Sequence, residues 1–179
     1  VYFEAARELG TAIAANHWSL VYGGNALGLM KAVADAARAA GGRVVGVTPR
    51  RWVDDCTHDP DCHELIVTDD MRQRKGHMEA RGDAFVALPG GLGTFEELFE
   101  VIVGRSLGYH AKPIVVLNVG GYFAPLLAMV EHGIDGGFIR PSARQLYHVS
   151  PTVPNAIAHL KAPHPVRRPD ADARSSARE

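Results

Sequence analysis

The chain has 179 residues and nearly balances its charges, with 19 lysines and arginines against 20 aspartates and glutamates. A formal net charge of −1 argues against a protein that coats nucleic acid with a basic surface. Two cysteines are too few for a disulfide-stabilised secreted domain, and no apolar run reaches the roughly 18 residues that span a bilayer.

Short apolar segments alternate with segments of helical periodicity along the chain. Helices are expected at about 3–13, 27–40, 71–79, 95–107 and 123–130, and strands at 18–22, 44–47, 65–67, 84–88 and 113–117. An irregular polar loop is expected at 50–63, and a closing strand with a short last helix at 141–161. Apolar strands that alternate with helices are typical of a parallel sheet covered on both faces. The sequence therefore predicts an α/β fold, a doubly wound and Rossmann-like sheet.

Domain organisation follows from length and from composition near the C-terminus. We expect a single nucleotide-binding domain over 1–161 and a disordered tail over 162–179, where prolines and arginines replace large apolar residues. The chain opens on a helix, whereas doubly wound domains begin with a central strand, so a first strand is expected to be missing. The N-terminal residues do not resemble a signal peptide, and a cytoplasmic protein with no membrane partner is expected.

Two glycine-rich turns follow predicted strands, Tyr-Gly-Gly-Asn-Ala-Leu-Gly at 22–28 and Pro-Gly-Gly-Leu-Gly-Thr-Phe-Glu-Glu at 89–97. Glycines let a ligand approach the backbone closely, and the helix that follows offers free N–H groups to a phosphate. The first turn lacks the ending of a P-loop, and Glu96 occupies the third glycine position of a dinucleotide motif. ATP hydrolysis and NAD binding are therefore disfavoured. The second turn favours a phosphate site, whereas the first is equally compatible with a plain tight turn.

Two further patterns have a functional and a structural interpretation each. The spacing Thr94-x-x-Glu97 favours a capping box, although the Glu97 carboxylate would also overlook the mouth of the sheet. Met71, Arg74, Lys75 and Met78 lie on one stripe of the helix expected at 71–79, which Asp69 or Asp70 is expected to cap. The two cations require an anionic partner, either a nearby glutamate or a bound phosphate, unless they extend along the core edge to water.

The segment 54–63 holds two cysteines and two histidines, but their spacing is not that of a zinc site, and no metal is expected. The other histidines are scattered, at His17, His77, His110, His132 and His148, and none is expected to be catalytic. Ser106 has no nucleophile-elbow context, so a serine hydrolase is unsupported.

The motifs Pro-Gly-Gly-x-Gly-Thr-x-x-Glu at 89–97 and Met-x-x-Arg-Lys-x-x-Met at 71–78 resemble those of the Lonely Guy family. These enzymes are cytokinin riboside 5′-monophosphate phosphoribohydrolases and are often labelled lysine decarboxylases. The resemblance implies a homodimer that needs no cofactor and releases a free base from an N6-modified adenosine monophosphate, or from AMP.

The resemblance also implies roles for individual residues. Arg74 and Glu97 match the catalytic pair, and the residues that match the phosphate cradle or lie near the nucleotide are Gly24, Met71, Lys75, Met78, Gly90, Gly91, Gly93 and Thr94. Two other interpretations stay open. One is a non-catalytic carrier of a nucleotide or of the molybdenum cofactor on the same fold, and the other is a truncated, inactive relative.

Overall fold

A computed structural model describes residues 1–164, so most of the predicted tail, at 165–179, lies outside the described residues. The strands are β1 (Leu20–Tyr22), β2 (Val44–Pro49), β3 (Glu64–Thr68), β4 (Phe85–Ala87), β5 (Ile114–Leu117) and β6 (His148–Ser150). The α-helices are α1 (Tyr2–Ala15), α2 (Gly28–Ala39), α3 (Arg50–Asp54), α4 (Met71–Arg81), α5 (Leu92–Ser106), α6 (Ala124–Asp135) and α7 (Val153–Lys161).

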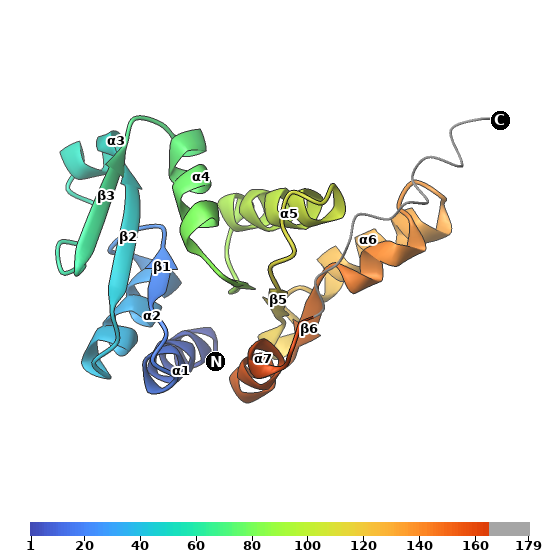
Figure 1. Cartoon of the computed structure of the whole chain (residues 1–179), viewed down its shortest axis with the longest axis horizontal. Helices are drawn as coiled ribbons and strands as arrows, with labels where there is room; N and C mark the ends of the chain where they lie inside the picture. The colour runs from blue at the N-terminus through green and yellow to red at the C-terminus, as the bar shows by residue number, and fades with distance from the viewer. Residues whose placement is uncertain (165–179) are drawn as a thin grey trace.

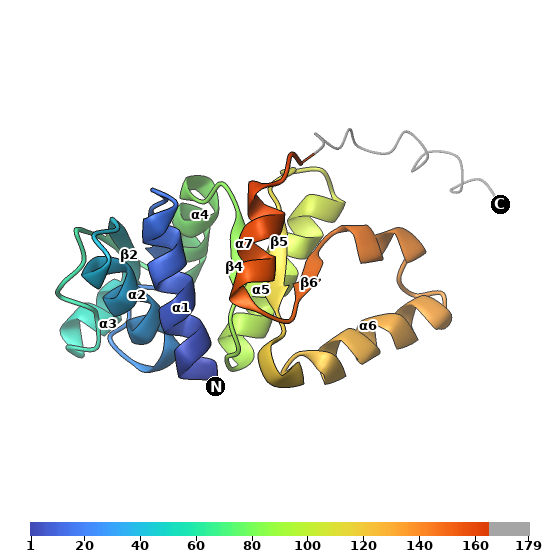
Figure 2. The ribbon, with the colours of Figure 1, turned by 90° about the horizontal axis from the view of Figure 1, so that it is seen from below.

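The described strands are all parallel and form two three-stranded sheets, β1–β2–β3 and β4–β5–β6. Helices α1, α2 and α7 cover one face of the strands, and α4, α5 and α6 lie on the other (Figures 1 and 2). The predicted α/β class with helices on both faces is therefore confirmed. Within residues 1–164, the strands are divided into these two sheets, and no described strand pairs β1 with β4.

The core explains why these segments form strands. Val44, Val47, Val115 and Val116 are almost fully buried, as expected for strands that are covered on both faces. Residues of α1, α2 and α7 pack with β5 in one cluster that includes Ala6, Leu9, Val33, Val115, Leu117 and Ile157. This shared core holds the two sheets together across their division.

Three boundaries differ from the expectation. The segment expected to be a loop at 50–63 begins with a helical turn, α3. Helix α5 begins at Leu92 rather than at Phe95, and α6 continues to Asp135 rather than ending near Val130. The predicted cap of α4 is confirmed, because the Asp70 carboxylate accepts hydrogen bonds from the N–H groups of Arg72 and Gln73. Within residues 1–164, no helix is both long and apolar enough to cross a membrane.

A buried polar cluster ties the loop after α3 to β1. The Asp59 carboxylate is 1% exposed and accepts hydrogen bonds from the Tyr22 hydroxyl at 2.5 Å and from Arg38 at 2.8 Å. The N–H of Asp59 donates to the carbonyl of Gly24 at 2.8 Å. Burial, together with the bond to Asp59, raises the pKa of Tyr22, which therefore stays a hydrogen-bond donor. This cluster fixes the loop beside the first glycine turn.

Asp59→Asn is expected to lower the free energy of unfolding by about 3 kcal/mol at neutral pH, because it leaves Arg38 without its buried counter-charge. Burial alone would raise the pKa of Asp59, but the bonds from Tyr22 and Arg38 lower it below the ordinary value of 3.8. A lowered native pKa stabilises the fold above the unfolded-state value, and that contribution is lost as the pH falls through the native pKa. Urea titrations from pH 7 to pH 3 should therefore show the difference between the two proteins shrinking on acidification. A difference that is constant with pH would contradict this.

Candidate active site

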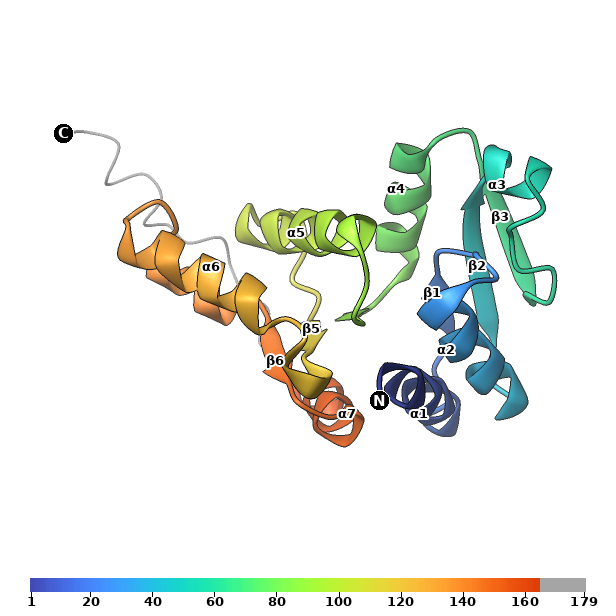
Figure 3. The same cartoon turned by 180° about the vertical axis from the view of Figure 1, so that it is seen from behind.

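Helices α4 and α5 bring the predicted pair of charged residues together. Nη1 of Arg74 donates to Oε1 of Glu97 at 2.6 Å. The Arg74 side chain is 3% exposed, whereas 34% of the Glu97 side chain reaches solvent. Because Arg74 holds Oε1, the partly exposed carboxylate keeps Oε2 available to a ligand. Figure 3 shows α4 and α5 side by side from behind.

Protein groups enclose the Arg74 guanidinium on its other sides. Its Nε donates to the carbonyl of Val47, at the end of β2, at 3.0 Å. The ring of Trp52 lies 5.0 Å from the guanidinium carbon, at cation–π distance. A β-carbon added to Gly23 would collide with Nη2 of Arg74. Arg74 is thus a buried charge with Glu97 as its counter-ion, and we call the space bounded by Val47, Trp52, Gly23 and Glu97 the seat of its guanidinium.

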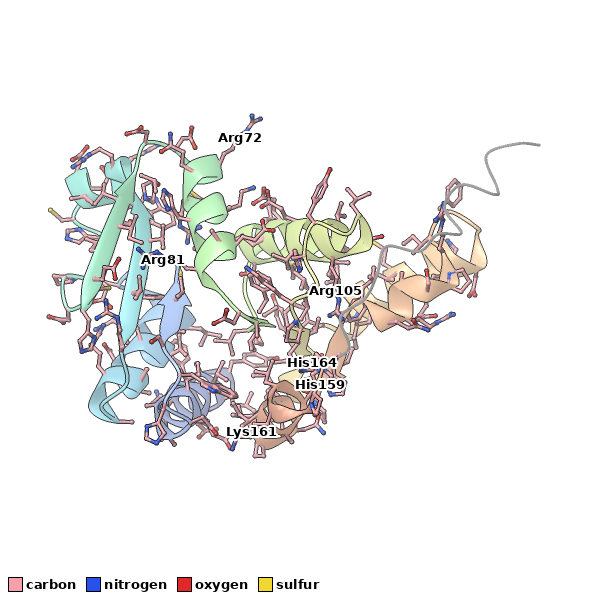
Figure 4. The ribbon with its side chains drawn as sticks, in the orientation of Figure 1. Arg72, Arg81, Arg105, His159, Lys161 and His164 are labelled. Atoms are coloured by element: carbon pink, nitrogen blue, oxygen red, sulfur yellow. The ribbon has the colours of Figure 1, made fainter. Side chains whose placement is uncertain are left out.

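The neighbouring cation of the predicted stripe has a different environment. Lys75 forms ion pairs with Glu96 and with Glu100, the second at 2.9 Å, and its hydrogen bonds to these carboxylates raise its pKa. Met78 is half-buried, and Met71 is 41% exposed. Arg72 projects away from the body of the protein at the start of α4 (Figure 4). Both cations of the stripe therefore have glutamates of α5 as their anionic partners among the described residues.

The second glycine turn runs directly into α5. Gly91 is the N-cap in an extended conformation, and no side chain caps the helix within the described residues. The predicted capping box is therefore wrong: Thr94 lies inside the helix and Glu97 pairs with Arg74 instead. A β-carbon at Gly91 or Gly93 would meet no described atom within 4 Å, so the backbone here faces open space. The first N–H groups of a helix lack intrahelical acceptors and attract anions.

The first glycine turn closes over β2. Gly24 has a φ of +67°, which favours glycine, and a β-carbon there would lie 3.1 Å from the N atom of Val47. Asn25 bridges to His58 in the loop that Asp59 holds. Around this turn, Asn25 Oδ1, Thr48 Oγ1 and His58 Nδ1 are buried without a hydrogen-bond partner among the described residues. Such atoms require water or a ligand, so this turn can form further hydrogen bonds to a bound molecule.

A surface hollow of about 330 Å³ adjoins the second turn. Its lining includes Pro89 and Gly90, Leu29 of α2, the first residues of α1, and Tyr122, whose hydroxyl donates to the Gly90 carbonyl at 2.5 Å. A larger hollow, of about 480 Å³, follows α1 and α2 and includes Arg7, Lys31 and Asp35. The smaller hollow is the more relevant one, because it contacts the glycine turn beside α5.

The histidine and cysteine residues assemble no metal centre in the described part of the chain. Cys56 and Cys62 are free thiols, and burial raises the pKa of Cys62, which lies beside the Tyr22 hydroxyl. His148 and His159 stack with ring centroids 4.0 Å apart, and His159 lies near His164 (Figure 4). This group lies on β6, α7 and the residues after it rather than on α4 or α5.

Sequence reasoning missed two residues near the site, Trp52 and Asp59. A large aromatic side chain in a polar segment that follows a strand was the available signal for Trp52. Asp59 offered none, because an aspartate before a proline is typical of any surface turn.

Known proteins are similar to this chain over most of its length. Residues 30–160 match the family model described as possible lysine decarboxylase. A probable cytokinin riboside 5′-monophosphate phosphoribohydrolase of Oryza sativa subsp. japonica is 44% identical over 161 residues, covering 90% of this chain and 66% of the relative. The cytokinin riboside 5′-monophosphate phosphoribohydrolase of Mycobacterium tuberculosis is 46% identical over 154 residues, covering 86% and 82%. The chain thus spans about two thirds or more of these relatives.

Solved structures give a second likeness. The molybdenum cofactor carrier protein of Chlamydomonas reinhardtii superposes with a TM-score of 0.67 at 28% identity, covering 89% of this chain and 86% of that one. The cofactor-binding protein of Rippkaea orientalis has a TM-score of 0.68 at 23% identity, which speaks to the fold alone. The domain architecture is therefore shared between named hydrolases and named carriers.

Proposed function

The chain belongs to the Lonely Guy family, whose model is described as possible lysine decarboxylase, and from this premise we propose that it is a phosphoribohydrolase. It hydrolyses the N-glycosidic bond of AMP or an N6-modified AMP, and the products are the free base and ribose 5-phosphate. The observation that carries the proposal is the Arg74–Glu97 pair, in which Glu97 lies five residues beyond the first residue of a helix with a glycine-rich N-terminus.

The chemistry requires a negative group beside the sugar. Breaking the C1′–N9 bond leaves positive charge on the ribose ring, as in glycoside hydrolysis. The free oxygen of the Glu97 carboxylate stabilises this charge and accepts a proton from the attacking water. The water oxygen bonds to C1′, and the departing base takes up a proton at nitrogen. Glu97 is the proposed catalytic residue.

Arg74 acts in this proposal by positioning. Its side chain is 3% exposed and bound to Val47 and Glu97, so its role is to orient the carboxylate. The 5′-phosphate binds at the start of α5, where Gly90, Gly91, Gly93 and Thr94 form the cradle. Glu97 follows Leu92, the first residue of α5, by five residues, a rise of about 7.5 Å, so the phosphate and the C1′ atom of one ribose can reach the anchor and the carboxylate together.

The remaining substrate contacts are assigned by position. Gly24 belongs to the first glycine turn, where the unpartnered Asn25 and Thr48 atoms offer polar groups to the nucleotide. Met71 and Met78 lie on the Arg74 face of α4. Lys75 neutralises Glu96 and Glu100, which would otherwise repel a phosphate at the start of α5.

The proposal includes a homodimer and a cytoplasmic location. Exposed apolar side chains on α5, at its C-cap and on α6, namely Val103, Leu107 and Met129, supply a surface for a second copy. Two unpaired thiols suit a reducing compartment. The reaction needs no cofactor, because a carboxylate, a water molecule and a bound phosphate suffice for it.

A non-catalytic carrier is the second candidate, favoured by the likeness to the molybdenum cofactor carrier protein at a TM-score of 0.67. The two candidates differ in whether bound nucleotide is cleaved. A carboxylate that is 34% exposed and held by a buried arginine is suited to stabilise positive charge on a sugar ring, so the Arg74–Glu97 pair favours the hydrolase.

The test is incubation of the purified protein with AMP, with N6-isopentenyl-AMP and with the matching nucleosides, and chromatography of the free base. Base release from at least one monophosphate, and none from the nucleosides, is the expected result, because the phosphate anchors the ribose. Calorimetric binding of a monophosphate without base release would favour the carrier.

A further inference from the structure

Arg74 is held by a residue that the motifs do not include. The ring of Trp52, on the short helix α3, lies 5.0 Å from the guanidinium carbon of Arg74. The Arg74 side chain is 3% exposed. A guanidinium attracts the face of an aromatic ring, and this attraction strengthens when water is excluded. The indole therefore forms one wall of the seat in which Arg74 lies.

The backbone of Trp52 is itself fixed by the loop that follows it. The carbonyl of Trp52 accepts hydrogen bonds from the N–H groups of Thr57 at 2.9 Å and His58 at 3.2 Å, and from the Thr57 hydroxyl at 3.3 Å. The same loop is bound to β1 through Asp59. Helix α3 follows β2 directly, and the Val47 carbonyl of β2 accepts from Arg74 as well. The backbone that carries the ring is thus attached to the strand that also binds the arginine.

The four neighbours of the guanidinium act in different ways. The Val47 carbonyl and the Glu97 carboxylate each bind one nitrogen, and Gly23 leaves room for Nη2. Two hydrogen bonds still allow the guanidinium to move, whereas the attraction to the Trp52 ring, 5.0 Å from its carbon, opposes that movement. Such a movement would take Nη1 away from Oε1 of Glu97.

We propose that Trp52 is a positioning residue: through its cation–π contact with Arg74 it sets the position of the guanidinium, and through it that of the Glu97 carboxylate. The inference deepens the proposed hydrolase and rests on it. Trp52 touches neither water nor sugar in this scheme, so its replacement changes kcat rather than KM.

The experiment compares aromatic and aliphatic replacements. Trp52→Phe and Trp52→Tyr keep a ring over Arg74, whereas Trp52→Leu keeps an apolar side chain without one. We expect kcat to fall by about 10-fold or more in Trp52→Leu, with KM and the melting temperature close to those of Trp52→Phe, which retains most of the activity. Trp18→Leu is the matched control, because Trp18 precedes β1 at the opposite end of that strand from the site. Equal kcat values for Trp52→Leu and Trp52→Phe would overturn the proposal.

A fluorescence readout separates this inference from the hydrolase itself. In a Trp18→Phe background, Trp52 is the one tryptophan of the chain. Its emission should change on Arg74→Met and stay unchanged on Lys75→Met, whether or not the protein cleaves nucleotides. Base release from no monophosphate would refute the hydrolase. A Trp52 emission that is the same with and without Arg74→Met would refute the contact between the ring and the guanidinium.

Discussion

Glu97→Gln is expected to lower kcat for base release by about 10³-fold while the protein stays folded. The glutamine oxygen still accepts the hydrogen bond from Arg74, so the geometry is kept and the negative charge is removed. Because neutralisation leaves the buried Arg74 without its counter-charge, the melting temperature is expected to fall, although the retained hydrogen bond keeps the protein folded at the assay temperature. Steady-state assays with AMP, beside thermal unfolding, measure both quantities. Full activity in a folded Glu97→Gln protein would remove the catalytic assignment.

A double-mutant cycle then tests how Arg74 contributes. If the arginine acts only by orienting the carboxylate, Arg74→Met lowers kcat in the wild-type background and has little further effect in Glu97→Gln. If it bound the substrate independently, the two losses would multiply and KM would rise. The low exposure of Arg74, 3%, favours the first result.

Local patterns were sufficient to predict most of the fold. The strands β2 and β5 are short apolar runs whose burial depends on their own residues, and the Asp70 cap is a contact within one turn. The division of the strands into two sheets was not predicted, because alternation of strands and helices indicates a parallel sheet but does not fix which strands are neighbours.

The site was predictable to the extent that its parts follow strands. Arg74 and Glu97 meet because α4 and α5 both start beyond the carboxyl ends of strands, on the same face of the protein. The start of α5 was not predictable from Thr94, because Gly91 ends the turn without a side-chain cap and the helix gains three residues. Helix α3 has five residues, too few to show helical periodicity, so the role of Trp52 required its position beside Arg74.

Gly23→Ala is expected to lower kcat by about 10²-fold, through a methyl group that touches no substrate. The position has no positive φ, so alanine fits its backbone. The added β-carbon would collide with Nη2 of Arg74 and lie 3.0 Å from Sδ of Met30. The thioether can move, but the guanidinium is bounded by Val47, Trp52 and Glu97 and has to leave its seat.

Gly76→Ala is the matched control for this variant, because it adds the same methyl group to α4 at a place where a β-carbon meets no described atom within 4 Å. The control should keep wild-type kcat and gain about 1 kcal/mol of stability from helix propensity. Gly23→Ala should instead lose kcat and lower the melting temperature, and Trp52 emission should shift as the guanidinium moves. Wild-type kcat in Gly23→Ala would mean that Arg74 tolerates displacement, and Glu97 would then act without a fixed partner.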